Sequence, residues 1–359
     1  MSMKKIYLFV LLALGAMSLS ACSGSRASIV NSWSGLSADG ELAYLAAGSH
    51  VYAVDVTNGN EVWRYPAEAD SGILFYATPV LTTDGQLLIG SEGTNHEFIS
   101  LDPATGKENW AKPFTGAKSK WVASPLVFND TIYAPNSDGF LYILDLSGNK
   151  VSDPIELGGT LWSSPVTDGT NLYLTSLDHS LYVIDMATGK VGEPVDLGGA
   201  APSAPVLGEG GVYVGSFSSK VEFIKSTGER EVLSTAANWI WGTPTLDTNT
   251  LYYADLSGNL YSMDLATSKQ NWDSVQPDGP VVASPQVMED QIYVVTESGS
   301  LLALDRDAKV VWEKTVGGNI YTAPAFSGNV VLVAPYKADF ALAAYDIDGK
   351  QAWTFTPEK

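Results

Sequence analysis

The stretch Phe98-Ile99-Ser100-Leu101-Asp102-Pro103-Ala104-Thr105-Gly106-Lys107-Glu108-Asn109-Trp110 is one copy of a pattern that recurs along the chain. An apolar run ends in Asp, and a Thr-Gly or similar turn and often a Trp follow. The anchor aspartates of the copies are Asp55, Asp102, Asp145, Asp185, Asp264, Asp305 and Asp346. With Lys225 in the Asp position of an eighth copy, successive anchors are 47, 43, 40, 40, 39, 41 and 41 residues apart. A period near forty that is filled with short strands is typical of propeller blades.

Each copy contains four short runs rich in β-branched and aromatic residues, separated by Gly, Asp, Asn and Ser. In the seventh copy these runs are 283–287, 291–295, 301–305 and 309–312. Such runs predict antiparallel strands, here named A to D from first to last. The sequence therefore predicts an all-β, eight-bladed β-propeller of four-stranded antiparallel blades over residues 29–359. Both ends are in phase with the repeat, so closure needs no borrowed strand, although residues 23–31 could instead extend the last blade.

The anchor aspartates are predicted to be structural turn residues and not catalytic ones. An Asp at the end of a strand can accept hydrogen bonds from backbone amides a few residues later, and Gly supplies a positive φ. The Trp of strand D offers a large apolar ring for packing against the neighbouring blade. It occurs at Trp63, Trp110, Trp272, Trp312 and Trp353.

The first residues have the features of an export signal. Lys4 and Lys5 precede an apolar stretch, 6–17, which is shorter than the roughly 20 residues that span a bilayer as a helix. Leu19-Ser20-Ala21-Cys22 resembles the lipobox of bacterial lipoproteins, and Cys22 is the only cysteine. We therefore expect a removed signal peptide (1–21), lipidation at Cys22, a short linker (22–28) and an extracytoplasmic protein anchored to the cell membrane or outer membrane.

The charge of the chain argues against nucleic acid as a partner. The chain has 20 basic and 40 acidic residues; without Lys4 and Lys5 the balance is 18 against 40, or −22. Such a negative field repels phosphate backbones.

The repeat resembles that of pyrroloquinoline-quinone (PQQ)-type β-propellers, as Phe98 to Trp110 shows. That family includes quinoprotein alcohol dehydrogenases and BamB, the lipoprotein scaffold of the outer-membrane β-barrel assembly machinery. The dehydrogenases imply PQQ held by adjacent cysteines, calcium and a catalytic Asp. This chain has one cysteine and almost no insertions between blades, and no common catalytic motif is present. We therefore predict no catalytic residues and neither PQQ nor calcium; a degenerate PQQ-dependent dehydrogenase is the alternative.

His50, His96 and His179 all fall in or beside connections between strands B and C, on one predicted face. A metal site is conceivable there, but B–C turns of different blades lie apart around a ring, and no tight ligand spacing is present. We interpret the three histidines as polar turn residues and predict no metal site.

A further pattern lies three residues before the strand A proline of each blade. That position, here the channel-mouth position, holds Trp33, Tyr76, Val122, Trp162, Pro202, Trp241, Val282 and Tyr321. Because strand A is innermost in the family, we expect these residues at one mouth of a central channel. The rings could wedge between blades, or they could form a funnel for an apolar peptide, a carbohydrate or another small ligand. The predicted binding residues are Trp33, Tyr76, Trp121, Trp162, Trp239, Trp241 and Tyr321.

Blades 3 to 5 lack the strand D Trp, so we expect three consecutive weak outer strands. Either a partner docks there by strand addition or this surface has simply drifted. The leading hypothesis is a membrane-anchored, monomeric, non-catalytic scaffold that binds other envelope proteins, in cell-envelope or outer-membrane protein assembly.

Overall fold

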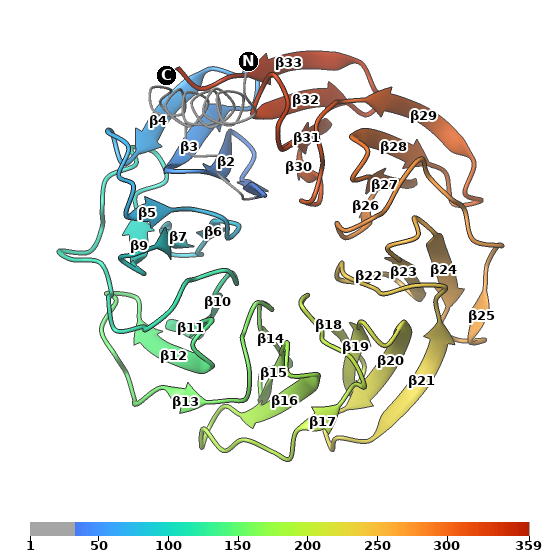
Figure 1. Ribbon diagram of the computed structural model, residues 1–359, viewed down its shortest axis with the longest axis horizontal. Coiled ribbons are helices and arrows are strands. Elements are labelled where there is room, and N and C mark those ends of the chain that lie inside the picture. Colours follow the sequence, from blue (N-terminus) through green and yellow to red (C-terminus); the bar gives the residue numbers. More distant parts are fainter. Residues whose placement is uncertain (1–32, 359) are drawn as a thin grey trace, which may run out of the picture. The chain divides into compact units, whose positions relative to one another are not determined.

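The computed structural model describes residues 33–358, so the signal peptide, Cys22 and residues 23–31 lie outside the described residues. The described chain is all-β and forms a ring of eight blades around a central opening (Figure 1). The predicted eight-bladed propeller is therefore confirmed. Within residues 33–358, no helix has the length and apolar character needed to cross a membrane.

Seven of the blades are four-stranded antiparallel sheets in simple meander order. Blade 1 consists of β1 (Gly35–Ala38), β2 (Leu42–Ala47), β3 (His50–Asp55) and β4 (Glu61–Tyr65). Blade 3 consists of β10 (Leu126–Phe128), β11 (Thr131–Pro135), β12 (Phe140–Asp145) and β13 (Ile155–Glu156). Blade 4 consists of β14 (Val166–Thr167), β15 (Asn171–Thr175), β16 (Ser180–Asp185) and β17 (Val195–Asp196).

The remaining four-stranded blades follow in chain order. Blade 5 consists of β18 (Val206–Gly208), β19 (Gly211–Gly215), β20 (Lys220–Lys225) and β21 (Arg230–Thr235). Blade 6 consists of β22 (Thr245–Asp247), β23 (Thr250–Ala254), β24 (Leu260–Asp264) and β25 (Lys269–Gln270). Blade 7 consists of β26 (Gln286–Met288), β27 (Gln291–Val295), β28 (Ser300–Leu304) and β29 (Val310–Thr315). Blade 8 consists of β30 (Ala325–Ser327), β31 (Val330–Val333), β32 (Leu342–Asp346) and β33 (Gln351–Phe355).

Blade 2 departs from the four-stranded plan. Its sheet has three strands, β6 (Val80–Leu81), β7 (Leu87–Gly90) and β9 (Phe98–Leu101), and β5 (Ile73–Leu74) pairs separately with β8 (Glu92–Gly93). Isolated bridges of Glu108 and Phe114 to β9 occupy the place of the outer strand. Pro113 lies between them and has no N–H to donate, which limits a continuous ladder.

Within residues 33–358 the ring closes without a shared strand, as the phase of the repeat predicts. Blades 8 and 1 are each built from one contiguous segment within the described residues. Side chains join them instead: Trp353 Nε1 donates to the Val56 carbonyl at 2.8 Å, and Ser327 Oγ donates to the Gly40 carbonyl at 2.8 Å. Buried Leu36, Leu45 and Val54 of blade 1 also share an apolar cluster with strands of blade 8.

The innermost strands meet so closely that small residues are required near their starts. A Cβ on Gly35 would lie 2.3 Å from the Ala77 carbonyl oxygen of blade 2, and one on Gly242 would lie 2.9 Å from Ala283 of blade 7. Between blades 2 and 3, Ser124 Oγ donates to the Thr78 carbonyl at 2.9 Å. These contacts hold the inner strands of neighbouring blades directly against each other.

Each anchor aspartate caps its turn. All seven carboxylates accept hydrogen bonds from backbone N–H groups two to four residues later. At Asp55, the hydrogen bonds from Thr57 hold the pKa of the carboxyl below its usual value. In blade 5, Lys225 keeps the turn through backbone bonds and pairs with Glu229 at 2.6 Å instead.

The strand D tryptophans connect each blade to the turn of the next one. Each indole Nε1 donates to the carbonyl of the residue that follows the next anchor Asp: Trp63 to Pro103, Trp110 to Leu146, Trp272 to Arg306, Trp312 to Ile347, and Trp353 to Val56. In four of these contacts the ring lies against the turn glycine, where a Cβ would come within 2.6 or 2.7 Å of it. We call this arrangement the interblade tryptophan contact.

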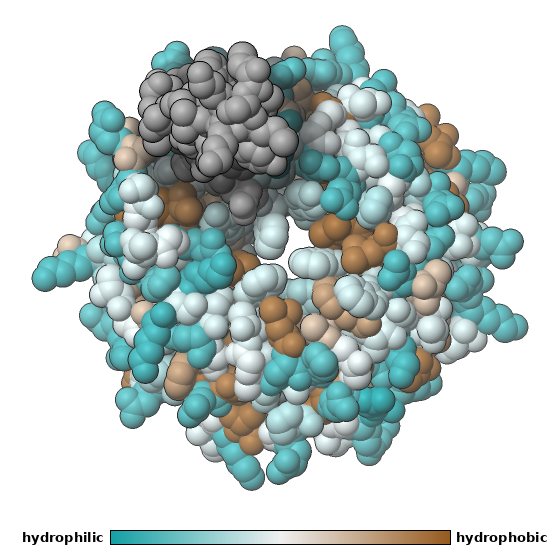
Figure 2. All heavy atoms as spheres, in the orientation of Figure 1, coloured by the Kyte–Doolittle hydropathy of each residue, from teal (hydrophilic) through white to brown (hydrophobic). Residues whose placement is uncertain are grey.

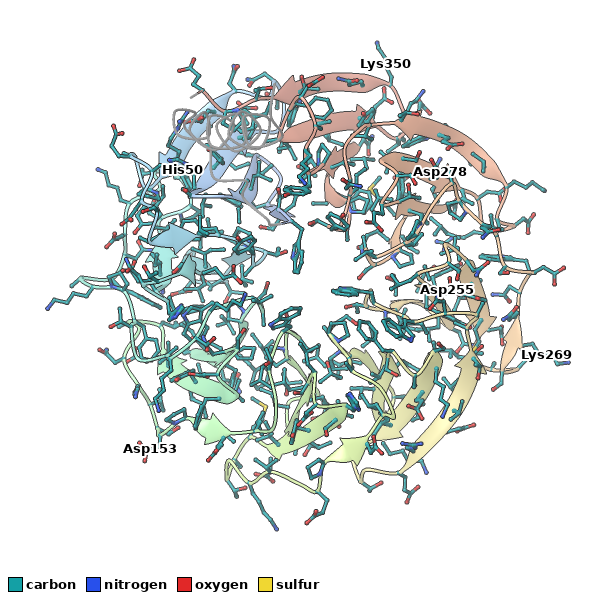
Figure 3. All side chains as sticks on the ribbon, viewed as in Figure 1. His50, Asp153, Asp255, Lys269, Asp278 and Lys350 are labelled. Carbon is teal, nitrogen blue, oxygen red and sulfur yellow. The ribbon has the colours of Figure 1, made fainter. Side chains whose placement is uncertain are left out.

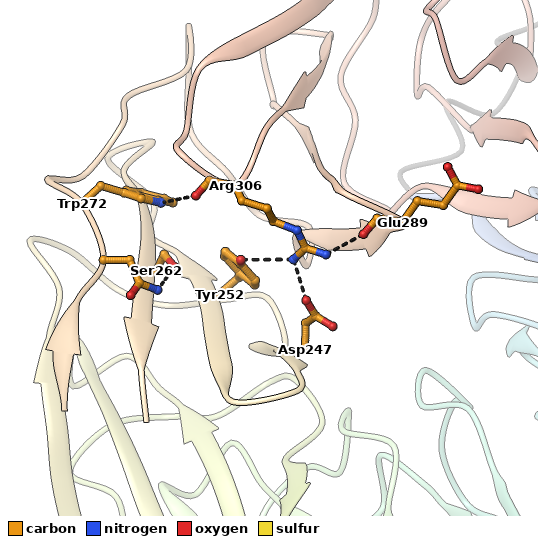
Figure 4. A network of polar contacts seen from close by, with 7 residues as sticks. Asp247, Tyr252, Ser262, Trp272, Glu289 and Arg306 are labelled. Atoms are coloured by element: carbon orange, nitrogen blue, oxygen red, sulfur yellow. Dashed lines mark hydrogen bonds and ion pairs between the residues drawn. The ribbon is translucent and has the colours of Figure 1, made fainter. Parts of the chain in front are cut away.

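Figure 4 shows the interblade tryptophan contact between blades 6 and 7. Trp272 Nε1 reaches the Arg306 carbonyl at 3.2 Å, and Ala308 stands where the other turns have glycine, with φ of 63°. The Arg306 guanidinium adds an ion pair to Asp247 at 2.5 Å and a hydrogen bond to the Glu289 carbonyl. The Asp247 contact fastens the turn of blade 7 to the end of β22 in blade 6, and the Glu289 contact holds Arg306 to the β26–β27 turn of its own blade.

The expected run of weak outer strands in blades 3 to 5 is wrong for blade 5. Outer strands β13 and β17 have two residues each, but β21 of blade 5 has six (Figure 1). The outer strand β25 of blade 6 has only two residues, although Trp272 follows it. The Trp acts through its contact with the next blade, whereas outer-strand length depends on the backbone ladder within a blade. The two features are therefore independent.

Candidate functional site at the channel mouth

The eight channel-mouth positions surround one central pocket. Its lining includes Trp33, Tyr76, Val122, Trp162, Pro202, Trp241, Val282 and Tyr321, with a cavity volume of about 420 Å³. Side chains project from the inner strands toward the central opening (Figure 3), and hydrophobic residues lie beside that opening in the space-filling view (Figure 2). The repeat therefore gathers one side chain from every blade into a single site.

Backbone contacts fix the ends of the inner strands at this mouth. Two residues before the channel-mouth position, a carbonyl accepts an N–H from the B–C turn of the same blade. The N–H of Leu177 reaches the Thr160 carbonyl at 3.1 Å, and that of Leu256 reaches the Trp239 carbonyl at 2.9 Å. The start of strand A and the B–C turn therefore lie at the same end of the blade.

Trp33 of blade 1 and Trp162 of blade 4 meet edge to face, with ring centroids 6.3 Å apart and planes at 66°. Trp33 is 36% exposed, and Trp162 is half-buried. The buried Trp162 Nε1 has no hydrogen-bond partner among the described residues. Two distant blades thus contribute to one aromatic surface, which retains an unused donor.

A second aromatic cluster lies on blades 5 and 6. Phe217 stacks on Trp239, with centroids 4.9 Å apart and planes at 11°, and contacts Trp241 at 5.2 Å. Trp239 is 50% exposed. Sequence reasoning missed Phe217, although its position in the B–C turn of blade 5 could have indicated it. The cluster extends the aromatic surface from the channel mouth onto the face of the ring.

The two mouth tyrosines are held as neutral hydrogen-bonding groups. Tyr321 donates to Glu297 Oε1 at 3.0 Å. Burial, reinforced by the Glu92 carboxylate, raises the pKa of Tyr76 to about 12. Glu92 is itself paired with Lys120 at 2.7 Å. Charged groups therefore stand behind the tyrosines and outside the pocket lining.

Trp121 does not belong to this site, and its assignment to the channel mouth is wrong. It is fully buried, packs on Phe98 and Tyr142 with centroids 5.0 and 5.5 Å away, and donates Nε1 to the His96 carbonyl. Trp121 is adjacent to the channel-mouth residue Val122, and successive side chains of an extended strand point to opposite sides. Trp121 therefore points between blades 2 and 3.

Two of the three histidines occupy turns, and the third begins a strand. His96 and His179 have positive φ values of 50° and 75°, and His50 begins β3. Among residues 33–358, no group of three or more His, Cys, Asp or Glu is arranged to hold a metal ion. The prediction of turn residues agrees with the backbone geometry of His96 and His179.

The pocket lining does not fit PQQ, which carries three carboxylates. Every residue that lines it is apolar, aromatic or uncharged, and no Lys, Arg, Asp or Glu is among them. A buried anion needs paired charges, and calcium takes six to eight oxygen ligands, usually including carboxylates. The lining supplies no cation to pair with the PQQ carboxylates and no carboxylate to bind calcium.

Comparison with known proteins agrees with this description. The family model described as "Outer membrane protein assembly factor BamB" matches residues 47–274 and 274–359. The chain belongs to the BamB family. A BamB from Legionella pneumophila (strain Paris) is 26% identical over 129 residues, which are 36% of this chain and 31% of that relative's length.

Solved structures share the fold of this BamB-family chain. BamB from Moraxella catarrhalis matches with a TM-score of 0.63 and 16% identity, over 88% of this chain and 91% of that one. The computationally designed Ika8 protein matches with a TM-score of 0.62 and 15% identity, over 82% and 92% of the two chains. At such identities the likeness concerns the fold alone.

Proposed function

We propose that this protein is a non-catalytic scaffold in outer-membrane protein assembly that holds other envelope proteins at its channel mouth. Membership of the BamB family supports the assembly role. The observation that carries the binding role is a partly exposed aromatic surface around one pocket that all eight blades line and that carries no charged side chain. Clustered Trp and Tyr side chains are enriched where proteins bind one another most strongly.

The chemistry of the mouth favours an apolar polypeptide segment. Trp33, Trp239 and Trp241 offer partly exposed rings, and the pocket lining carries no charge that a segment would have to pair. The Ser and Thr hydroxyls and the Gln286 amide of the lining can form hydrogen bonds with the backbone of such a segment. A bound strand or loop would thus gain apolar burial together with directional hydrogen bonds.

The same composition supports a role without chemistry. A Ser or Thr hydroxyl becomes an effective nucleophile only beside a general base, and the pocket lining, which carries hydroxyls, contains no His, Asp, Glu, Lys or Cys. We propose that the protein works without PQQ, calcium or another metal. Attachment to a membrane through lipidated Cys22, and action as a monomer, belong to the same proposal.

The test is crosslinking and co-purification from native membranes with the full-length protein. Combined Trp162→Ala and Trp241→Ala should reduce the yield of crosslinked envelope proteins at least tenfold, since both rings line the pocket. Val311→Ala is the control, because Val311 is 51% exposed on outer strand β29. Full partner recovery by the double variant, with an unchanged melting temperature, would refute the mouth as the binding surface.

A second arm addresses the anchor. Cys22→Ser should move the protein from the membrane fraction to the soluble extracytoplasmic fraction, because the acyl chains provide the attachment. Retention of the variant in the membrane fraction would refute anchoring through Cys22. This result is independent of the binding arm.

A further inference from the structure

A pocket opens at the outer part of the interface between blades 4 and 5, away from the channel mouth. Blade 4 contributes Val183, Gly192, Glu193 and Val195, and blade 5 contributes its turn, 226–228. Its cavity volume is about 490 Å³, within the range of roughly 300 to 1,000 Å³ of ligand pockets. None of the channel-mouth residues lines it.

Comparison with the other copies of the repeat shows which side chain occupies the equivalent position at other interfaces. In blades 1 and 2, where the turn glycine stands four residues after the anchor Asp as in blade 4, the Trp stands eight residues after that Asp, at Trp63 and Trp110. In blade 4, Glu193 stands eight residues after Asp185. Glu193 is exposed and lines the pocket, so the pocket occupies the position that an indole fills at five other interfaces.

The receiving turn is also in place. The Ser226 carbonyl of blade 5 corresponds to the carbonyls of Pro103 and Leu146, which accept the Nε1 of Trp63 and Trp110 at 2.9 Å. No donor among residues 33–358 bonds to the Ser226 carbonyl. Gly228 leaves room for a ring, since the nearest atom to its Cβ position is Val195 Cγ2 at 3.6 Å.

The two other interfaces without a Trp are filled from within the chain. Between blades 3 and 4, Ile155 packs with Leu172 and Ile184 in one apolar cluster. Between blades 5 and 6, Leu233 and Leu265 join a second cluster. Between blades 4 and 5, Val195 stands at the position equivalent to Ile155 and packs with Val212 and Ile224 of blade 5, and the pocket lies beside this apolar contact.

We propose that this pocket binds a tryptophan side chain of a partner polypeptide, with a basic residue beside that tryptophan. The indole would lie on Gly228 and donate its N–H to the Ser226 carbonyl, as the chain's own tryptophans do at other turns. The lining also holds Lys190, which lies near Asp185 of the same lining, and the nearby cations Lys225 and Arg230 are paired with Glu229 and Glu222. Glu193 has no ion pair in residues 33–358. Its carboxylate is thus available to the partner's basic group. The inference rests on the proposed scaffold role, since a partner protein must supply the tryptophan.

The probe is a capped peptide with the sequence of residues 60–65, Asn-Glu-Val-Trp-Arg-Tyr, which carries 5-fluorotryptophan. Its single fluorine signal can be followed by ¹⁹F NMR against the full-length protein in detergent. We expect saturable broadening with a Kd of about 1 mM or lower. The same peptide with Glu in place of Arg should bind at least threefold more weakly.

Glu193→Trp fills the pocket from within the chain and should weaken peptide binding at least tenfold. Glu313→Trp is the matched control, because it makes the same substitution at an exposed site on β29 and should leave binding unchanged. Should Glu193→Trp fail to fold, Glu193→Lys tests the site by charge repulsion and should weaken binding at least threefold. Equal binding to the wild type and the Glu193 variants would overturn the proposal, as would no binding to the wild type at 5 mM peptide.

This outcome is separable from that of the scaffold proposal. The Trp162→Ala and Trp241→Ala variant should bind the peptide like the wild type, because those residues line the other pocket. Suppose that the variant loses its membrane partners while the peptide fails to bind the wild type. The scaffold proposal is then supported, and the proposal of a tryptophan-binding pocket is refuted.

Discussion

The interface between blades 7 and 8 and the interface between blades 4 and 5 use the same kind of turn with different contacts. At the first, Trp312 donates to the Ile347 carbonyl at 2.7 Å and lies against Gly349. At the second, Glu193 replaces the Trp, and Arg230 crosses to hydrogen-bond the Asp196 carbonyl of blade 4. The turn glycine of the repeat therefore has two roles: it allows the positive φ of its own turn, and it leaves space for the tryptophan ring of the preceding blade.

The largest effect should follow removal of one interblade tryptophan. Trp63→Ala leaves a cavity between blades 1 and 2 and an unpaired Pro103 carbonyl, so we expect a loss of about 3 to 5 kcal/mol in the free energy of unfolding. Val232→Ala, at the equivalent position of blade 5 and 46% exposed, should cost less than about 0.5 kcal/mol. Urea denaturation measures the free energy of unfolding of both variants. Equal losses would contradict the proposed difference between interfaces with and without a tryptophan contact.

The next effect separates ring contact from backbone strain. Gly106→Ala places a Cβ 2.6 Å from the Trp63 ring at a φ of +68°, whereas at Gly228 the nearest atom is 3.6 Å away and φ is +87°. Left-handed strain alone costs about 1 to 2 kcal/mol, and forced overpacking adds about 1 to 3 kcal/mol. The melting temperature of Gly106→Ala, measured by thermal unfolding, should therefore be lower than that of Gly228→Ala. The reverse order would show that the glycine serves only its own turn.

A stabilising change should come from restoring the missing contact. Glu193→Trp should raise the free energy of unfolding by about 0.5 to 2 kcal/mol, as cavity-filling substitutions commonly do. Glu313→Trp should remain within about 0.5 kcal/mol of the wild type, because it touches no pocket. Chemical denaturation measures the free energy of unfolding of both variants. A destabilised Glu193→Trp protein would mean that the pocket does not accept an indole.

The smallest effect concerns Glu222, which is 1% exposed on β20 and faces Val232 across the ladder. Burial raises the pKa of its carboxyl, and Arg230, with Nε 3.5 Å from Oε1, opposes that rise. Because the folded pKa exceeds the unfolded one, the stabilising contribution is present below about pH 4.3 and is lost as pH rises through the folded pKa. Glu222→Gln should therefore gain stability relative to the wild type, by less than about 1 kcal/mol, between pH 4 and pH 8. Urea midpoints at both pH values check this; a difference that stays constant with pH would contradict it.

The blades could be predicted from the sequence because a meander is a local structure. Strands that are joined by short turns pair with their chain neighbours, so the period alone defines the sheets. The channel-mouth ring was predictable for the same reason, since one position recurs in every blade. Trp121 was misplaced because its single-residue offset from Val122 reverses the direction of the side chain, whereas Trp239, two residues from Trp241, stays on the exposed side.

The interblade contacts were less accessible to sequence reasoning. The strand D Trp was expected to pack against a neighbouring blade, but its acceptor lies about forty residues away and is a backbone carbonyl, which no residue type marks. The pocket at Glu193 follows from an absent side chain, and its depth depends on how far Val195 and the turn of blade 5 approach each other. Such distances are set by packing between blades.

The closure between blades 8 and 1 has a consequence for how the gene could be rearranged. Because each sheet is one contiguous segment and Trp353 joins Val56 as any other interface Trp joins its turn, no ladder depends on where the chain begins. A circular permutant opened between β13 and β14 would keep every described sheet intact. The order of blades along the polypeptide is thus a cyclic sequence with an arbitrary starting point, and a blade could be inserted, duplicated or exchanged at any boundary between blades without dividing a sheet.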